Sequence, residues 1–88
     1  MKLNPIFRDR MVFAANLPIR IYGEGCGKAE IAFAGQTKTV VSEEAFWLTE
    51  LAAMPYGGPY TLTVSFETET VVLEDIYVGE VYLFAGQS

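Results

Sequence analysis

The stretch Tyr60-Thr61-Leu62-Thr63-Val64-Ser65-Phe66 decides the fold class of this chain. Large apolar residues alternate in it with hydroxyl residues, and successive side chains of a β-strand point to opposite faces. The alternation therefore predicts a strand with one face in a core and the other in water, with Tyr60 on the core face. Threonine, which is branched at Cβ, also favours a strand.

Shorter stretches of the same kind lie on both sides of this strand. They are residues 19–22, 30–33, 37–41, 45–48 and 70–73. Short strands at a spacing of about ten residues are typical of a sandwich of two sheets. The sequence therefore predicts an all-β fold, a small antiparallel β-sandwich of the jelly-roll or immunoglobulin-like kind.

Turn residues separate the predicted strands. Ala34-Gly35-Gln36 predicts a tight hairpin turn, because glycine accepts a positive φ at little cost. Residues 23–27 are rich in glycine and predict an irregular loop, whereas residues 55–59, with a proline at each end, predict a corner. Ser42 is a suitable helix cap, so a short helical turn is expected over residues 42–45.

The C-terminal residues follow a different pattern. From Val81 to Ala85 the chain is continuously apolar, which is typical of a strand covered on both faces in an α/β sheet. We therefore expect residues 1–76 to form the sandwich module. Residues 77–88 are expected to form a linker and the first strand of a second, α/β domain that continues beyond Ser88.

Composition excludes several classes of function. The net charge of −5 argues against binding to nucleic acid and to anionic membrane surfaces, since both require basic residues. A single cysteine, Cys26, and the absence of histidine exclude an internal disulfide, a Cys/His zinc site and a Ser–His pair within the chain. No cofactor or metal is expected, and the paired carboxylates at 43–44, 67/69 and 74–75 are interpreted as solvated edges.

The N-terminus and the apolar content bear on location and partners. No apolar stretch approaches the length of about 18 residues that a membrane span needs, and none follows Lys2 as in a signal peptide. A cytoplasmic location is favoured, and a secreted one stays open if a signal preceded the chain. Hydrophobic residues make up 51% of the sequence, more than a thin core requires, so an apolar surface that packs on a missing partner is expected.

Several motifs, taken in order, resemble sialate O-acetylesterases, which are carbohydrate esterases of the SGNH type. The ending Val78-Gly79-Glu80-Val81-Tyr82-Leu83-Phe84-Ala85-Gly86-Gln87-Ser88 is similar to the first block of that family, V-G-E-V-W and then G-Q-S-N-M. Upstream, Phe7-Arg8-Asp9-Arg10-Met11-Val12, Pro18-Ile19-Arg20-Ile21-Tyr22-Gly23 and Gly57-Gly58-Pro59-Tyr60 resemble further family segments. Arg10 departs from the pattern, which often has histidine there.

The resemblance implies that Ser88 is the nucleophile of the parent enzyme and that its backbone N–H contributes to an oxyanion hole. The acetyl ester of a sugar, sialic acid or another, would be the substrate. The histidine and aspartate partners lie downstream in the family, so the 88-residue chain alone is expected to be inactive. Its partner would be its own SGNH catalytic domain.

An independent carbohydrate-binding or adhesion-type sandwich is the alternative. Of the aromatic residues, Tyr56 lies in a turn and is the candidate sugar contact, whereas Trp47 lies in an apolar run and is expected in the core with Tyr60. The apolar end distinguishes the two hypotheses, because a self-sufficient module buries it. If it is left open, we expect dimerisation or strand exchange through the segment from Tyr77 to Ala85.

Overall fold

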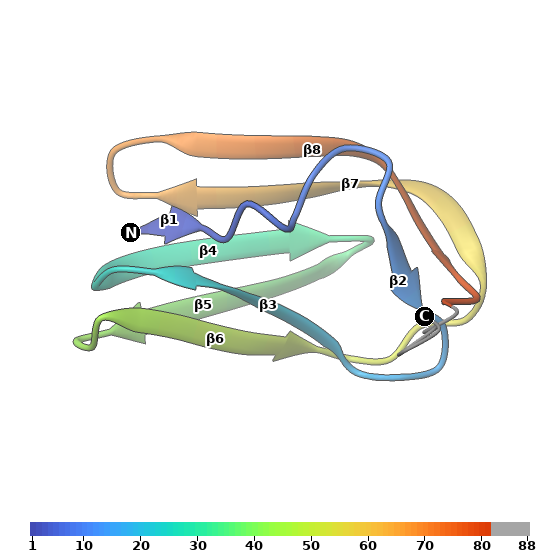
Figure 1. Ribbon diagram of the computed structural model, residues 1–88, viewed down its shortest axis with the longest axis horizontal. Coiled ribbons are helices and arrows are strands. Elements are labelled where there is room, and N and C mark those ends of the chain that lie inside the picture. The colour runs from blue at the N-terminus through green and yellow to red at the C-terminus, as the bar shows by residue number, and fades with distance from the viewer. Residues whose placement is uncertain (82–88) are drawn as a thin grey trace, which may run out of the picture.

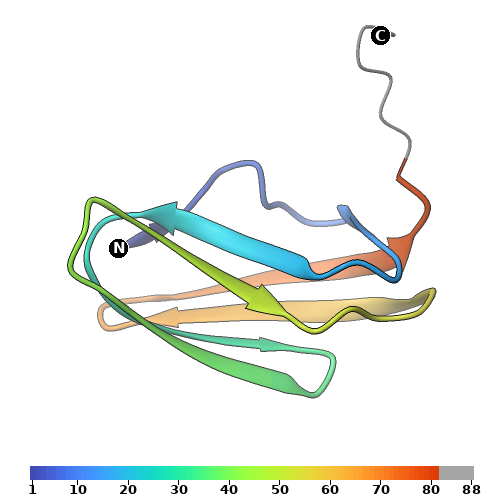
Figure 2. The same cartoon turned by 90° about the horizontal axis from the view of Figure 1, so that it is seen from below.

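The computed structural model describes residues 1–81, which form eight β-strands in two sheets and no helix. The strands are β1 (Lys2–Leu3), β2 (Val12–Ala14), β3 (Ile19–Glu24), β4 (Gly27–Phe33), β5 (Gln36–Ser42), β6 (Phe46–Leu51), β7 (Gly57–Phe66) and β8 (Thr70–Gly79). The three-stranded sheet has the order β1-β3-β6 and the five-stranded sheet the order β2-β8-β7-β4-β5 (Figure 1). Figure 2 shows the two layers from the side. The predicted all-β sandwich is therefore confirmed.

The alternating stretch lies in β7, near the centre of the five-stranded sheet. Leu62 and Val64 have no exposed surface, and Phe66 is 8% exposed, so the apolar face packs in the core as predicted. Tyr60 is only half-buried and packs its ring edge-on against Phe33. Within residues 1–81 no polar or charged side chain is buried, so the core consists of apolar and aromatic side chains.

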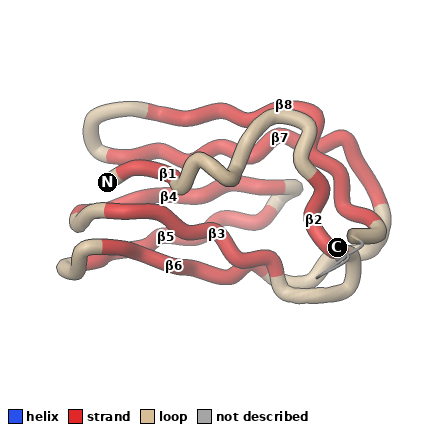
Figure 3. Tube along the Cα trace, viewed as in Figure 1, coloured by secondary structure: helices blue, strands red, loops and turns tan. Residues whose placement is uncertain are grey.

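One pair of strands is parallel, which the antiparallel prediction missed. β2 runs beside β8 with Val12 opposite Tyr77 and Ala14 opposite Gly79. The reason is the loop after β1, which leaves the three-stranded sheet and crosses to the far edge of the five-stranded sheet (Figure 3). β2 is therefore added at the edge of the sheet next to β8, and it runs parallel to β8.

The turns agree with the sequence in part. Ala34 and Gly35 form the expected two-residue hairpin turn between β4 and β5, with positive φ at both. The irregular loop expected at residues 23–27 is wrong in extent, because β3 continues to Glu24 and β4 begins at Gly27. Only Gly25 and Cys26 remain between them, at a corner where the chain passes from one sheet to the other.

The helical turn expected over residues 42–45 is also wrong. The Ser42 hydroxyl accepts a hydrogen bond from Glu44 N at 3.1 Å and donates one to Phe46 O at 2.9 Å. These bonds close a second corner between the sheets, from β5 to β6. Gly25 N donates to Ala45 O at 2.6 Å, so the two corners support each other. The corner expected at residues 55–59 continues into β7, which begins at Gly57.

The expected boundary after Ile76 falls within β8. This strand is interrupted by an irregularity at Asp75, whose φ is +58°, and then continues to Gly79. Ile76 is fully buried and Val78 is 2% exposed, so both belong to the core of the sandwich. The apolar segment from Tyr82 to Ala85 and Ser88 lie outside the described residues. No helix in residues 1–81 is long and apolar enough to cross a membrane.

Candidate functional site

The predicted nucleophile, Ser88, lies outside the described residues, so its surroundings are not part of this structure. Its role stays a prediction. Residues 1–81 form the surfaces described next. Two surfaces of the sandwich carry exposed apolar side chains together with polar groups, one at the end where the chain leaves β8 and one on the three-stranded sheet.

The first surface, called here the exit surface, consists of Val12, Tyr56, Tyr77 and Val81. The parallel pairing of β2 and β8 places Val12 beside Tyr77, and the Tyr77 ring lies against Gly58 at the start of β7. These four side chains are 44%, 57%, 47% and 44% exposed in the order given. Apolar groups therefore gather around the point where the chain leaves the sandwich.

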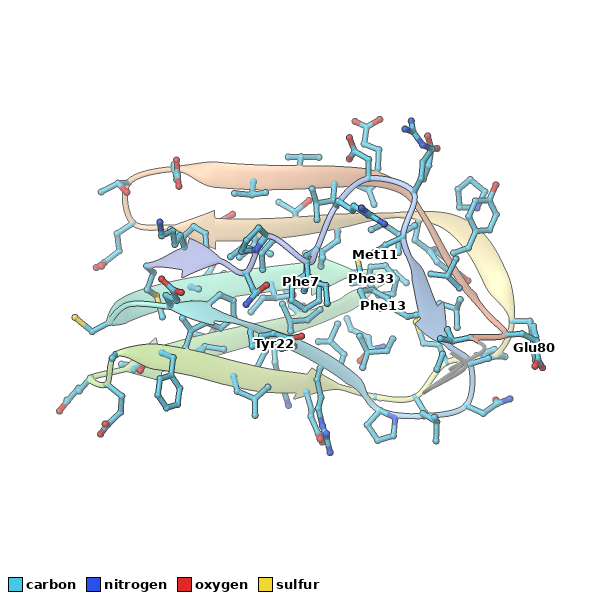
Figure 4. The ribbon with its side chains drawn as sticks, in the orientation of Figure 1. Phe7, Met11, Phe13, Tyr22, Phe33 and Glu80 are labelled. Carbon is cyan, nitrogen blue, oxygen red and sulfur yellow. The ribbon has the colours of Figure 1, made fainter. Side chains whose placement is uncertain are left out.

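A polar contact ties the chain at this exit. The Tyr56 hydroxyl donates a hydrogen bond to a carboxylate oxygen of Glu80, the residue after the end of β8, which is labelled in Figure 4. The prediction that Tyr56 is exposed is correct. Its hydroxyl is engaged with the outgoing chain, and its role as a sugar contact stays a prediction.

The second surface, called here the outer-sheet depression, lies on the outward face of the three-stranded sheet. It has a volume of about 540 Å³ and is lined by Asn4, Arg20, Tyr22, Glu24, Phe46 and Leu48, with Gly23 and Trp47 beneath. Register explains the grouping, because Tyr22 is opposite Leu48 and Glu24 is opposite Phe46 in the pair of β3 and β6. Phe46 is 68% exposed and Leu48 58%.

Phe46 and Leu48 are not among the candidate residues that the sequence predicts, because only Trp47 of this apolar run is considered there and is expected in the core. The signal was available, since three successive apolar residues in a strand cannot all face inward. Trp47 faces inward as predicted, is 3% exposed, and donates its indole N–H to Lys2 O at 3.2 Å. Its neighbours on either side must therefore face water.

An aromatic cluster supports the depression from the side. The loop between β1 and β2 inserts Phe7 between the sheets, where its ring is 4.9 Å from that of Tyr22 and 6.4 Å from that of Phe13. Phe13 in turn packs edge-on against Phe33 of β4 at 5.4 Å (Figure 4). Tyr22 is therefore held by the core on one side while it lines the depression on the other.

The remaining candidates behave as ordinary surface groups. The carboxylates at 43, 44, 67, 69, 74 and 75 are all exposed, which confirms their interpretation as solvated edges. Among residues 1–81 no group of acidic, cysteine and histidine side chains is arranged to hold a metal ion. Cys26 is exposed and unbridged.

Comparison with known proteins relates the sandwich to an esterase. The fold is similar to that of a carbohydrate acetylesterase from Xanthomonas citri, with a TM-score of 0.82 and 26% sequence identity. The similarity covers 89% of this chain but only 19% of that protein. No protein-family model matches the chain, and a search of curated proteins finds no match. The similarity indicates an esterase-related domain.

Proposed function

We propose that this chain is the N-terminal accessory domain of a carbohydrate esterase similar to the sialate O-acetylesterases. The observation that carries the proposal is its structural likeness, over 89% of its length, to about a fifth of a carbohydrate acetylesterase. The sequence Gly86-Gln87-Ser88 adds to this, because it resembles the nucleophile motif of that family. The substrate class is then an acetylated carbohydrate.

In the proposed reaction, the Ser88 hydroxyl attacks the carbonyl carbon of a sugar acetate. A histidine downstream of this chain takes the hydroxyl proton, because a serine hydroxyl is a poor nucleophile without a base. The backbone N–H of Ser88 donates to the oxyanion of the tetrahedral intermediate. The sugar leaves with the proton from the histidine, and water then hydrolyses the acetyl-serine, so acetate is released and the serine is restored.

The exit surface supports the accessory role. Val12 and Tyr77 present apolar groups beside the outgoing chain, and contiguous apolar surface is usually covered by a partner. A domain that continues the chain beyond Val81 would be held close to this surface. The hydrogen bond from Tyr56 to Glu80 would then fix the direction in which the chain enters that domain.

The experiment that tests the proposal extends the polypeptide beyond Ser88 along its gene. The extended protein is assayed on acetylated xylo-oligosaccharide and on O-acetylated sialic acid, beside its Ser88→Ala variant and the 88-residue chain. We expect the extended protein to release acetate. The variant should lose on the order of 10³-fold or more of the rate, as nucleophile variants of serine hydrolases do.

The 88-residue chain provides the negative control, since it contains no histidine to act as base. Its hydrolysis should not exceed the buffer blank. A folded extended protein that is inactive on both substrates, or equally active after Ser88→Ala, would contradict the proposal. The relative rates on the two substrates decide whether sialic acid or another sugar carries the acetyl group.

A further inference from the structure

We propose that the outer-sheet depression is a binding site for a neutral oligosaccharide chain. The choice of carbohydrate as the ligand class rests on the proposed function, whereas the position of the site and the preference for a neutral sugar rest on the geometry and charge of the depression. It is separate from the exit surface, because its residues come from β3, β6 and the start of the chain.

The floor of the depression suits a sugar ring. Tyr22, Phe46 and Leu48 stand on neighbouring strands, with Tyr22 directly opposite Leu48 in the register. One face of a pyranose ring is formed by C–H groups, which pack on apolar and aromatic side chains, and ligand sites of about 300–1,000 Å³ commonly combine such a lining with a few polar groups. The volume of the depression, about 540 Å³, lies within this range.

The border of the depression supplies hydrogen-bonding groups for sugar hydroxyls. Arg20 Nε donates to Glu50 Oε2 at 3.0 Å, and the guanidinium carries four further N–H donors. Asn4 accepts a hydrogen bond from Ile6 N at 2.9 Å through its side-chain oxygen, which fixes the amide at the border. Glu24 adds a carboxylate that accepts from hydroxyl groups.

Charge selects a neutral sugar over sialic acid. Two carboxylates on this face, Glu24 and Glu50, have cations opposite them: Arg20 is paired with Glu50, and Lys2 is opposite Glu24 in the register of β1 and β3. The charges on this face therefore balance, while the whole chain carries −5. A sialic acid carboxylate would find no cation there without an acidic neighbour, whereas a neutral xylose- or glucose-based chain needs none.

Two residues of the depression, Trp47 and Tyr22, are held in place by the core, which favours binding. Trp47 lies directly beneath it and is fixed by its hydrogen bond to Lys2 O and by its edge-on contact with Phe66 at 5.9 Å. Tyr22 is braced by Phe7. A site whose side chains are already in place loses little conformational entropy when the ligand binds. Trp47 is also the one tryptophan of the sequence, so its fluorescence reports on this site.

The test uses the 88-residue chain and titrates it with xylohexaose, cellohexaose and acetylated xylo-oligosaccharide, with sialyllactose as the anionic comparison. Binding is followed by Trp47 fluorescence and located by backbone amide NMR shifts. We expect at least one neutral sugar to bind more tightly than sialyllactose, with the largest shifts in β3 and β6. Phe46→Ala should weaken that binding roughly tenfold, as the loss of an aromatic contact does.

Val41→Ala is the matched control, because Val41 is 70% exposed but lies on β5 of the other sheet. It should leave the affinity unchanged. The proposal is overturned if none of the three neutral sugars binds at tens of millimolar, if the shifts gather at the exit surface instead, or if Phe46→Ala and Val41→Ala behave alike. The assay needs no esterase activity, so its result is independent of whether Ser88 is a nucleophile.

Discussion

A methyl group at Gly23 would collide with two parts of the fold at once. An ideal Cβ on this residue would lie 2.0 Å from the carbonyl oxygen of Lys2 and 2.9 Å from two carbons of the Trp47 ring. The first contact belongs to the pairing of β1 with β3, and the second to the floor beneath the outer-sheet depression. The glycine is therefore required by close approach.

We expect Gly23→Ala to lower the free energy of unfolding by about 3 kcal/mol, at the upper end of the usual cost of overpacking, because neither the β1 backbone nor the buried Trp47 ring can yield cheaply. Urea denaturation followed by Trp47 fluorescence measures this loss. Gly79→Ala is the control, since its Cβ would make an ordinary contact of 3.8 Å with Val12. Equal losses in the two variants would show that the close approach at Gly23 is unimportant.

At the scale of elements, the irregularity in β8 is held by the loop that precedes β2. Asp9 Oδ1 accepts a hydrogen bond from Glu74 N at 2.9 Å, and Arg10 N donates to Glu74 O at 2.9 Å. Asp75 then adopts a positive φ, and the strand continues beside β2. The loop therefore provides the hydrogen bonds that β8 lacks where its ladder is interrupted.

We expect Asp9→Ala to cost about 1 kcal/mol of stability, the usual net contribution of one hydrogen bond, because Glu74 N loses its acceptor. The Glu74 amide should also exchange its hydrogen with solvent faster. Asp9→Asn retains a side-chain oxygen in the same place and should keep most of the protection. If Asp9→Ala leaves the exchange rate of Glu74 unchanged, the loop does not stabilise the irregularity.

What the sequence predicts at this scale follows from local patterns. The alternation in β7 and the turn at Ala34-Gly35 depend on residues close together in the chain, and both are confirmed. The parallel pairing of β2 depends on where a loop carries the chain in space, so no local pattern predicts it. The need for glycine at position 23 is likewise not predictable from a local pattern, because it comes from contacts with Lys2 and Trp47, which are distant in sequence.

The outer-sheet depression is predictable from the sequence only in part. The run Phe46-Trp47-Leu48 was predicted as a strand, and the burial of Trp47 was predicted with it. That Phe46 and Leu48 meet Tyr22 on the outward face depends on the pairing of β3 with β6, two strands separated by the hairpin of the other sheet. Sequence alone could identify outward apolar side chains but not the surface they form.

For the molecule as a whole, the exit surface is one of the places where large apolar side chains remain exposed. The core is completed without Val12, Tyr56, Tyr77 and Val81, all of which remain substantially exposed. Covering these four side chains would stabilise the protein, since apolar surface removed from water contributes roughly 25 cal/mol per Å². We therefore expect this surface to promote association.

We expect the 88-residue chain to associate with itself at high concentration, through the segment that begins at Tyr77. Light scattering should give a mass that rises with concentration, and Tyr77→Lys should reduce the rise, because it replaces an exposed apolar side chain of the exit surface by a charged one. Val72→Lys, on the same strand and 49% exposed but outside the exit surface, is the control. A monomer mass at every concentration would contradict this expectation.

The measurement that tests the central claim most directly is covalent labelling of the polypeptide extended beyond Ser88. A fluorophosphonate reacts with a serine only when a base and an oxyanion hole activate it, as in the acyl-transfer step proposed here. The account predicts one adduct per molecule by intact mass spectrometry, carried by the peptide that contains Ser88 and absent from Ser88→Ala. A folded protein that takes up no label, or takes it up at another serine, would contradict the claim that this sandwich belongs to a serine esterase.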